Sequence, residues 1–183
     1  IASVKFDMKP GRQYIHRERS IKQAAINDIF RTVRKVYDKV EDKNPDLIHD
    51  PIWAKENLPF AAELLLGHLR YGTFGKNDIE SVHPVMRMNN WKTRNLVLAG
   101  NFNLTNVDEL FQILVDLGQH PSDFSDTVTM LENISHFLDR EIQHNFDTFK
   151  KQGHGNVEIS ELSARDLRVD NVLREASKRW DGG

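Results

Sequence analysis

The sequence contains no cysteine among its 183 residues. This absence excludes a disulfide framework, a thiolate metal site and a cysteine nucleophile within these residues. Long apolar runs are also missing, because the densest stretch, residues 60–66, is interrupted by Glu63 and is far shorter than the roughly 20 residues that span a membrane. The N-terminus shows no basic leader followed by an apolar core. We therefore expect a soluble, cytoplasmic protein that does not contact membranes.

An excess of one charge sign is missing too, since 25 Lys and Arg stand against 27 Asp and Glu and give a net charge of −2. Proteins that bind nucleic acid displace counterions with a basic surface, so this balance argues against a nucleic-acid partner. The eight histidines show no H-E-x-x-H spacing, and we expect neither a metal nor another cofactor. A hydrophobic content of 39% indicates a globular chain, and its length fits a single domain over residues 1–183.

The hydrophobic periodicity indicates both strands and helices. Pro10-Gly11 predicts the turn of a hairpin between residues 1–7 and 13–18. Ser20 predicts the start of the first helix, and Gly118 the end of a later one. We expect helices over residues 21–42, 106–117, 126–151 and 170–177, a loop over 43–51, and buried strands within 60–71 and 95–103. Because strands and helices do not alternate regularly, the pattern favours the α+β class.

Three polar residues next to these elements could together bind an amino acid. The Arg70 guanidinium suits a carboxylate, and Asp126, at the start of a helix, suits an ammonium group. Asn101 could donate an amide N–H to a developing oxyanion. Each residue also has an ordinary explanation. Arginine at a strand end commonly forms a surface ion pair, aspartate beside Ser125 commonly stabilises a helix N-terminus, and asparagine favours turns.

The segments around these residues resemble conserved motifs of the class II glutamine amidotransferases, which are N-terminal-nucleophile hydrolases. Residues 67–75, G-H-L-R-Y-G-T-F-G, are similar to G-H-[VT]-R-[YW]-[SA]-T-x-G. Residues 100–106, G-N-F-N-L-T-N, are similar to H-N-G-N-[LI]-x-N, with Gly100 in place of His and Phe102 in place of Gly. Residues 125–127, S-D-T, match S-[DE]-[TS]. Within the family, the glutaminase domains of amidophosphoribosyltransferases are the most similar.

The resemblance implies a four-layer αββα sandwich of the N-terminal-nucleophile hydrolase type, present here in part. It implies that Arg70 binds the α-carboxylate of glutamine with Thr73 nearby, and that Asp126 binds the α-ammonium. The Asn101 side chain and the backbone N–H of Phe102 would form the oxyanion hole. In the family, an N-terminal cysteine attacks the glutamine amide and releases ammonia.

The family nucleophile is the first residue of the mature chain, whereas residue 1 here is Ile1. We therefore expect a fragment that lacks about 50 N-terminal residues, estimated from domain size, and is inactive by itself. In purine synthesis the ammonia would pass to phosphoribosyl pyrophosphate, bound by a C-terminal phosphoribosyltransferase-like (glycosyltransferase) domain, in a protein that could be a homo-oligomer. Two alternatives remain open: a glutaminase serving glucosamine-6-phosphate or asparagine synthesis, and a non-catalytic relative that binds an amino acid or acts as a scaffold.

Overall fold

The computed structural model describes residues 1–69 and 79–182. The chain forms two compact units, Ile1–Pro84 and Val85–Gly183. The structure is mixed α and β with small sheets, 51% helix and 10% strand, which agrees with the expected α+β class. Along the described ranges, no helix is both long enough and apolar enough to cross a bilayer.

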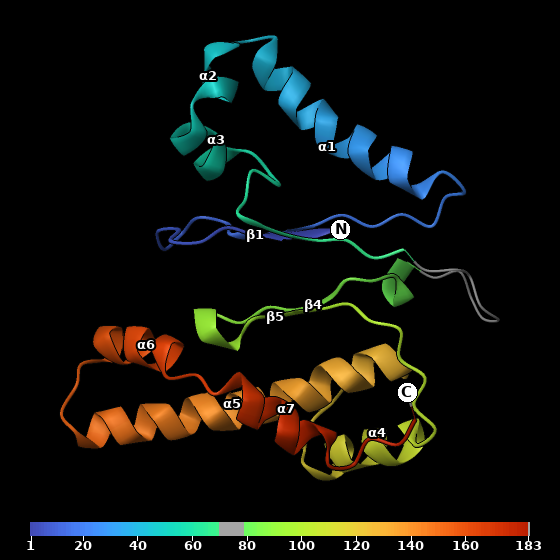
Figure 1. Ribbon diagram of the computed structural model, residues 1–183, viewed down its shortest axis with the longest axis vertical. Helices are drawn as coiled ribbons and strands as arrows, with labels where there is room; N and C mark the ends of the chain where they lie inside the picture. Colours follow the sequence, from blue (N-terminus) through green and yellow to red (C-terminus); the bar gives the residue numbers. More distant parts are fainter. Residues whose placement is uncertain (70–78, 183) are drawn as a thin grey trace. The chain divides into compact units, whose positions relative to one another are not determined.

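The first unit contains a three-stranded antiparallel sheet of β1 (Ala2–Val4), β2 (Ile15–Arg17) and β3 (Leu64–Leu66), in the order β2-β1-β3. β1 and β2 form the expected hairpin, and Gly11 in its turn has a φ of +85°, which glycine adopts without strain. The α1 (Ala25–Glu41), α2 (Asp46–His49) and α3 (Pro51–Asn57) helices lie on one side of this sheet (Figure 1). Asp50 accepts hydrogen bonds from the backbone N–H groups of Ile52 and Trp53 and so caps α3.

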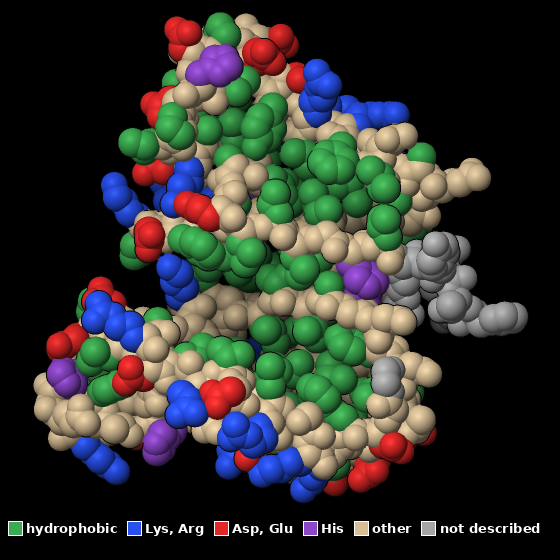
Figure 2. All heavy atoms as spheres, in the orientation of Figure 1, with side chains coloured by type: hydrophobic (Ala, Val, Ile, Leu, Met, Phe, Trp, Pro, Cys, Tyr) green, Lys and Arg blue, Asp and Glu red, His purple; other side chains and the backbone are tan. Residues whose placement is uncertain are grey.

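The α1 helix differs from the prediction at its start and is unusual in its packing. It begins at Ala25 instead of residue 21. Ser20 lies before the helix, where its hydroxyl accepts from the Lys22 N–H at 3.2 Å and donates to Asp28 Oδ2 at 2.8 Å. None of its residues is buried, and Ile26 and Phe30 are 51% and 59% exposed. Figure 2 shows apolar side chains gathered over this helix. The segment expected to be a loop after it contains the short α2 helix.

The second unit pairs β4 (Val85–Arg87) with β5 (Leu96–Leu98) in an antiparallel sheet. Four helices complete it: α4 (Val107–Asp116), α5 (Asp126–Lys151), α6 (Asn156–Arg165) and α7 (Val169–Ser177). Two 3₁₀ turns, Ile79–Ser81 in the first unit and Lys92–Arg94 in the second, lie in the connections. The α4, α5 and α7 helices confirm the sequence prediction, whereas β4 and α6 were not predicted as separate elements.

The core of the second unit forms along α5. Met130, Ile134, Leu138 and Ile142 recur every four residues and pack against Val172 and Ala176 of α7. This spacing places the four side chains on one face of α5, which explains why the long helix was predictable from its sequence. Trp180 packs against the same core, and its indole N–H donates to Asn133 Oδ1 at 3.0 Å.

Candidate functional site

The turn that follows β5 contains Gly100, Asn101 and Phe102. Phe102 packs against the core of the second unit. A Cβ atom built on Gly100 would lie only 2.4 Å from Cζ of Phe102, so the ring covers Gly100 and leaves room for glycine alone. The two departures from the H-N-G pattern are therefore coupled: the Phe102 ring occupies the space that a side chain at position 100 would need.

Phe102 causes no backbone strain in this turn. Among described residues other than glycine, only Asp7 and Phe60 have positive φ, so Phe102 lies in the region that L-residues ordinarily adopt. Asn101 is exposed, and its side chain forms no hydrogen bond with the other described residues. The turn thus presents an amide side chain that is available to an incoming molecule.

Asp126 is the first residue of α5, and Ser125 is its N-cap. The Ser125 hydroxyl accepts a hydrogen bond from the Val128 N–H at 3.2 Å. One carboxylate oxygen of Asp126, Oδ1, accepts from the backbone N–H of Thr127 at 2.7 Å and from its hydroxyl at 3.1 Å. A carboxylate at this position is favoured by the partial positive charge of the helix N-terminus. Oδ2 has no hydrogen-bond partner within the described ranges, which leaves it available to a cation.

Asn101, Phe102 and Asp126 all belong to the second unit, where they lie at the end of a strand and at the start of a helix. Arg70 and Thr73 fall in residues 70–78, outside the described residues. The preceding part of their motif, Gly67–Leu69, follows β3 in the first unit. The gathering of Arg70 with Asn101 and Asp126 around one ligand therefore stays a prediction.

The structure also reveals an ion-pair cluster between β4 and α5 that the sequence did not indicate. Arg87 bonds to Asp139 Oδ2 at 2.6 Å and to the Ser135 carbonyl at 3.3 Å. Arg94 lies 3.9 Å from the same carboxylate. Burial raises the pKa of the nearby Glu132 carboxyl, and Arg87 partly opposes this effect. This cluster fastens the small sheet to α5, and its partners are too distant in sequence for any local pattern to pair them.

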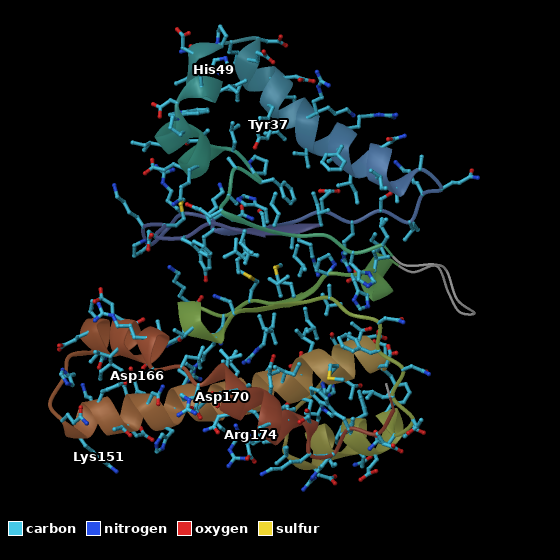
Figure 3. The ribbon with its side chains drawn as sticks, viewed as in Figure 1. Tyr37, His49, Lys151, Asp166, Asp170 and Arg174 are labelled. Carbon is cyan, nitrogen blue, oxygen red and sulfur yellow. The ribbon has the colours of Figure 1, made fainter. Side chains whose placement is uncertain are left out.

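A polar cleft of about 570 Å³ lies among α5, α6 and α7. Figure 3 labels Asp166, one of its lining residues. Its walls include Glu141, His144 and Arg168, and Arg168 is held by two hydrogen bonds to Asp170, at 3.0 and 2.9 Å. Asn101, Phe102 and Asp126 do not line this cleft. Across the described part of the chain, no three His, Cys, Asp or Glu side chains are grouped so that they could hold a metal ion.

Comparisons of this chain with protein-family models, curated proteins and solved structures found no significant match.

Proposed function

We propose that this chain is part of a glutaminase domain of the class II glutamine amidotransferase type, which releases ammonia from glutamine for transfer to an activated sugar such as phosphoribosyl pyrophosphate. The observation that carries the proposal is the order of three motifs: residues 67–75, 100–106 and 125–127. Residues 100–106 come after β5 and residues 125–127 stand at the start of α5, and these local positions support the proposal.

The architecture of each unit supports the proposal. In the first unit, the helices cover one side of the sheet, and Lys5 donates to the Leu58 carbonyl just beyond α3. In the second unit, Arg87 of β4 bonds to α5. Each unit is thus a helical layer on a small sheet. We propose that the complete domain has the four αββα layers of the family.

In the proposed reaction, Arg70 binds the α-carboxylate of glutamine with Thr73 nearby, and Asp126 Oδ2 binds the α-ammonium. The Asn101 amide and the Phe102 N–H stabilise the oxyanion that forms when the glutamine amide is attacked. The attacking thiolate is not among these 183 residues. The chain alone would therefore bind glutamine without hydrolysing it, and the complete cytoplasmic enzyme would supply the cysteine and the acceptor domain.

Isothermal titration of this chain with glutamine tests the binding half of the proposal. We expect Asp126→Asn and Arg70→Ala each to weaken binding at least tenfold, because each removes a charge-assisted contact. Asp123→Asn is the matched control, since it removes a nearby exposed carboxylate that has no proposed role. No measurable binding by the parent chain, or equal losses in Asp126→Asn and Asp123→Asn, would contradict the proposal.

The catalytic half needs the full-length gene product. If it encodes a cysteine at the mature N-terminus, Asn101→Ala should lower kcat for glutamine hydrolysis about 10²–10³-fold, the usual cost of one oxyanion donor. If it encodes none, glutaminase activity is excluded.

The coupled Gly100–Phe102 pair favours a second candidate, a non-catalytic relative that binds an amino acid, because it alters the turn that would form the oxyanion hole. Binding of glutamine without hydrolysis by the full-length protein would support this alternative. An acceptor other than phosphoribosyl pyrophosphate would keep the chemistry of the site and change only the acceptor domain.

A further inference from the structure

The face of the first sheet that carries Lys5 includes polar side chains from both β1 and β2, with Leu65 of β3 on the other side of Ser3. Ser3 of β1 pairs directly with His16 of β2, and the Lys5 N–H donates to the Tyr14 carbonyl, which extends the same ladder. Residues two apart in a strand share a face, and directly paired residues of antiparallel strands have neighbouring side chains. Ser3, Lys5 and His16 therefore lie side by side on the face from which Lys5 reaches the Leu58 carbonyl at 2.7 Å.

Ser3 and Lys5 are buried and His16 is half-buried, and the three side chains are incompletely hydrogen-bonded. Ser3 and Lys5 are each only 1% exposed. Within residues 1–69 and 79–182, neither the Ser3 hydroxyl nor Nε2 of His16 has a hydrogen-bond partner, and both atoms are buried. Buried polar atoms without partners are rare because their lost hydration is not replaced. Two such atoms on neighbouring residues of one face, beside a lysine, indicate that a further polar group belongs near them.

The charge of Lys5 indicates the sign of the missing group. In the described part of the chain, the one hydrogen-bond partner of the Lys5 ammonium group is the Leu58 carbonyl. The nearest carboxylate, Glu63, is held by an ion pair with Lys55 and accepts the Phe6 N–H at 3.0 Å. Burial lowers the pKa of Lys5, although Glu63 opposes this effect. A buried ammonium with one neutral acceptor and no paired carboxylate is costly, and a bound anion would offset that cost.

We propose that the first unit binds one small monovalent anion, a halide or a small carboxylate such as formate, between Lys5, Ser3 and His16. The Lys5 ammonium, the Ser3 hydroxyl and the Nε2–H of His16 are its three donors. A single full positive charge favours a monovalent ion over phosphate. The site uses none of the residues proposed for glutamine and does not depend on that function.

The protonation of His16 fits this role. Burial lowers the pKa of the His16 imidazole, and the nearby Lys5 charge lowers it further. The ring is therefore neutral at physiological pH and carries one N–H. To donate to the anion, it must carry that proton on Nε2, and ¹⁵N NMR of the imidazole distinguishes the two tautomers.

Urea unfolding in bromide, formate and gluconate salts at equal ionic strength tests the proposal. Trp53 fluorescence reports on unfolding of the first unit once Trp91 and Trp180, which lie in the second unit, are replaced by Phe. Gluconate is too large for a buried site. An anion at ten times its Kd should raise the folding equilibrium constant about 11-fold relative to gluconate. Comparing bromide with formate shows whether the site prefers a halide or a carboxylate.

Variants separate this site from a general salt effect. We expect Ser3→Ala to weaken anion binding about tenfold, as for loss of a hydrogen bond to a charged group. We expect Lys5→Met to abolish the stabilisation by the anion. Ser163→Ala is the matched control, because Ser163 also has a fully buried, unpartnered hydroxyl but lies in the second unit. If Lys5→Met does not fold, Ser3→Ala and His16→Gln decide the matter. Equal stability in all three salts, or an anion effect that survives Ser3→Ala unchanged, overturns the proposal.

Discussion

The coupling between Gly100 and Phe102 makes a quantitative prediction about the turn after β5. In Gly100→Ala the new methyl carbon would lie 2.4 Å from Cζ and 2.7 Å from Cε1 of Phe102, far inside van der Waals contact. The ring packs against the core of the second unit and cannot move away without disturbing it. Overpacking of this kind costs about 1–3 kcal/mol, and we expect Gly100→Ala to lower the free energy of unfolding by that amount.

The expected effect of Gly100→Ala on the free energy of unfolding changes sign when the Phe102 ring is removed. Gly100 does not have a positive φ, so alanine fits its backbone once Phe102 is replaced by Ala. In the Phe102→Ala background, Gly100→Ala should stabilise the chain by about 0.4–1 kcal/mol, because alanine restricts the unfolded state. The interaction energy between the two positions would then be at least about 1.4 kcal/mol, as is common for contacting residues.

Urea denaturation of the four chains in this double-mutant cycle measures the interaction energy. Trp180 is the natural reporter, because it packs against the same core as Phe102; replacing Trp53 and Trp91 by Phe isolates its signal. If Gly100→Ala costs the same free energy with and without the Phe102 ring, the ring does not cover Gly100 and the account of this turn is wrong. The same cycle with Gly100→His and Phe102→Gly tests whether the family pattern can be restored.

Three further results are expected. Ile142→Ala should lower the free energy of unfolding by about 2–5 kcal/mol, because Ile142 is fully buried; urea denaturation measures the loss, and a value below about 1 kcal/mol would contradict this packing. Gly118→Ala, at a φ of +82°, should destabilise α4, seen as faster amide exchange in its last turn, whereas unchanged exchange would exclude the left-handed cap. A hydrogen bond from Lys55 lowers the pKa of Glu63 from 4.5 to about 2, so the stability that this carboxylate provides above pH 4.5 should be lost as the pH falls towards 2. NMR titration of Glu63 checks this value, and an ordinary midpoint near 4.5 would show that the contact does not form in solution.

The sequence predicted the elements whose signals are local. The α5 helix begins and ends where expected, because Ser125 caps it and its apolar residues repeat every three to four positions over seven turns. The hairpin of β1 and β2 followed from Pro10-Gly11. By contrast, β4 is as short as β1 and β2, and no Pro-Gly turn signal marks its connection to β5. The α6 helix buries only Ile159 and Ser163, so its sequence lacks the repeating apolar positions that indicate a helix.

The candidate site also has features that the sequence could predict and features that it could not. Local patterns predicted Asn101 at the end of a strand and Asp126 at a helix start. Asp126 is the first residue of α5, whereas β5 ends at Leu98 and Asn101 lies in the turn that follows. Whether Arg70 meets them depends on contacts between segments far apart in the chain, which no local pattern encodes. The Ser3–His16 pair escaped prediction for a related reason. Strand alternation gives the face of each residue, but only the register between β1 and β2 sets them opposite each other.

The bare apolar side of α1 has a practical consequence for handling the protein. Side chains such as Phe30 and Ile26 form an exposed apolar strip on α1. Sulfate or phosphate buffers would strengthen the tendency of such a surface to associate. The purified chain should therefore bind environment-sensitive dyes while fully folded, and it should be retained on phenyl resins. A dye signal from this protein would report the strip on α1 and should not be taken as a sign of unfolding.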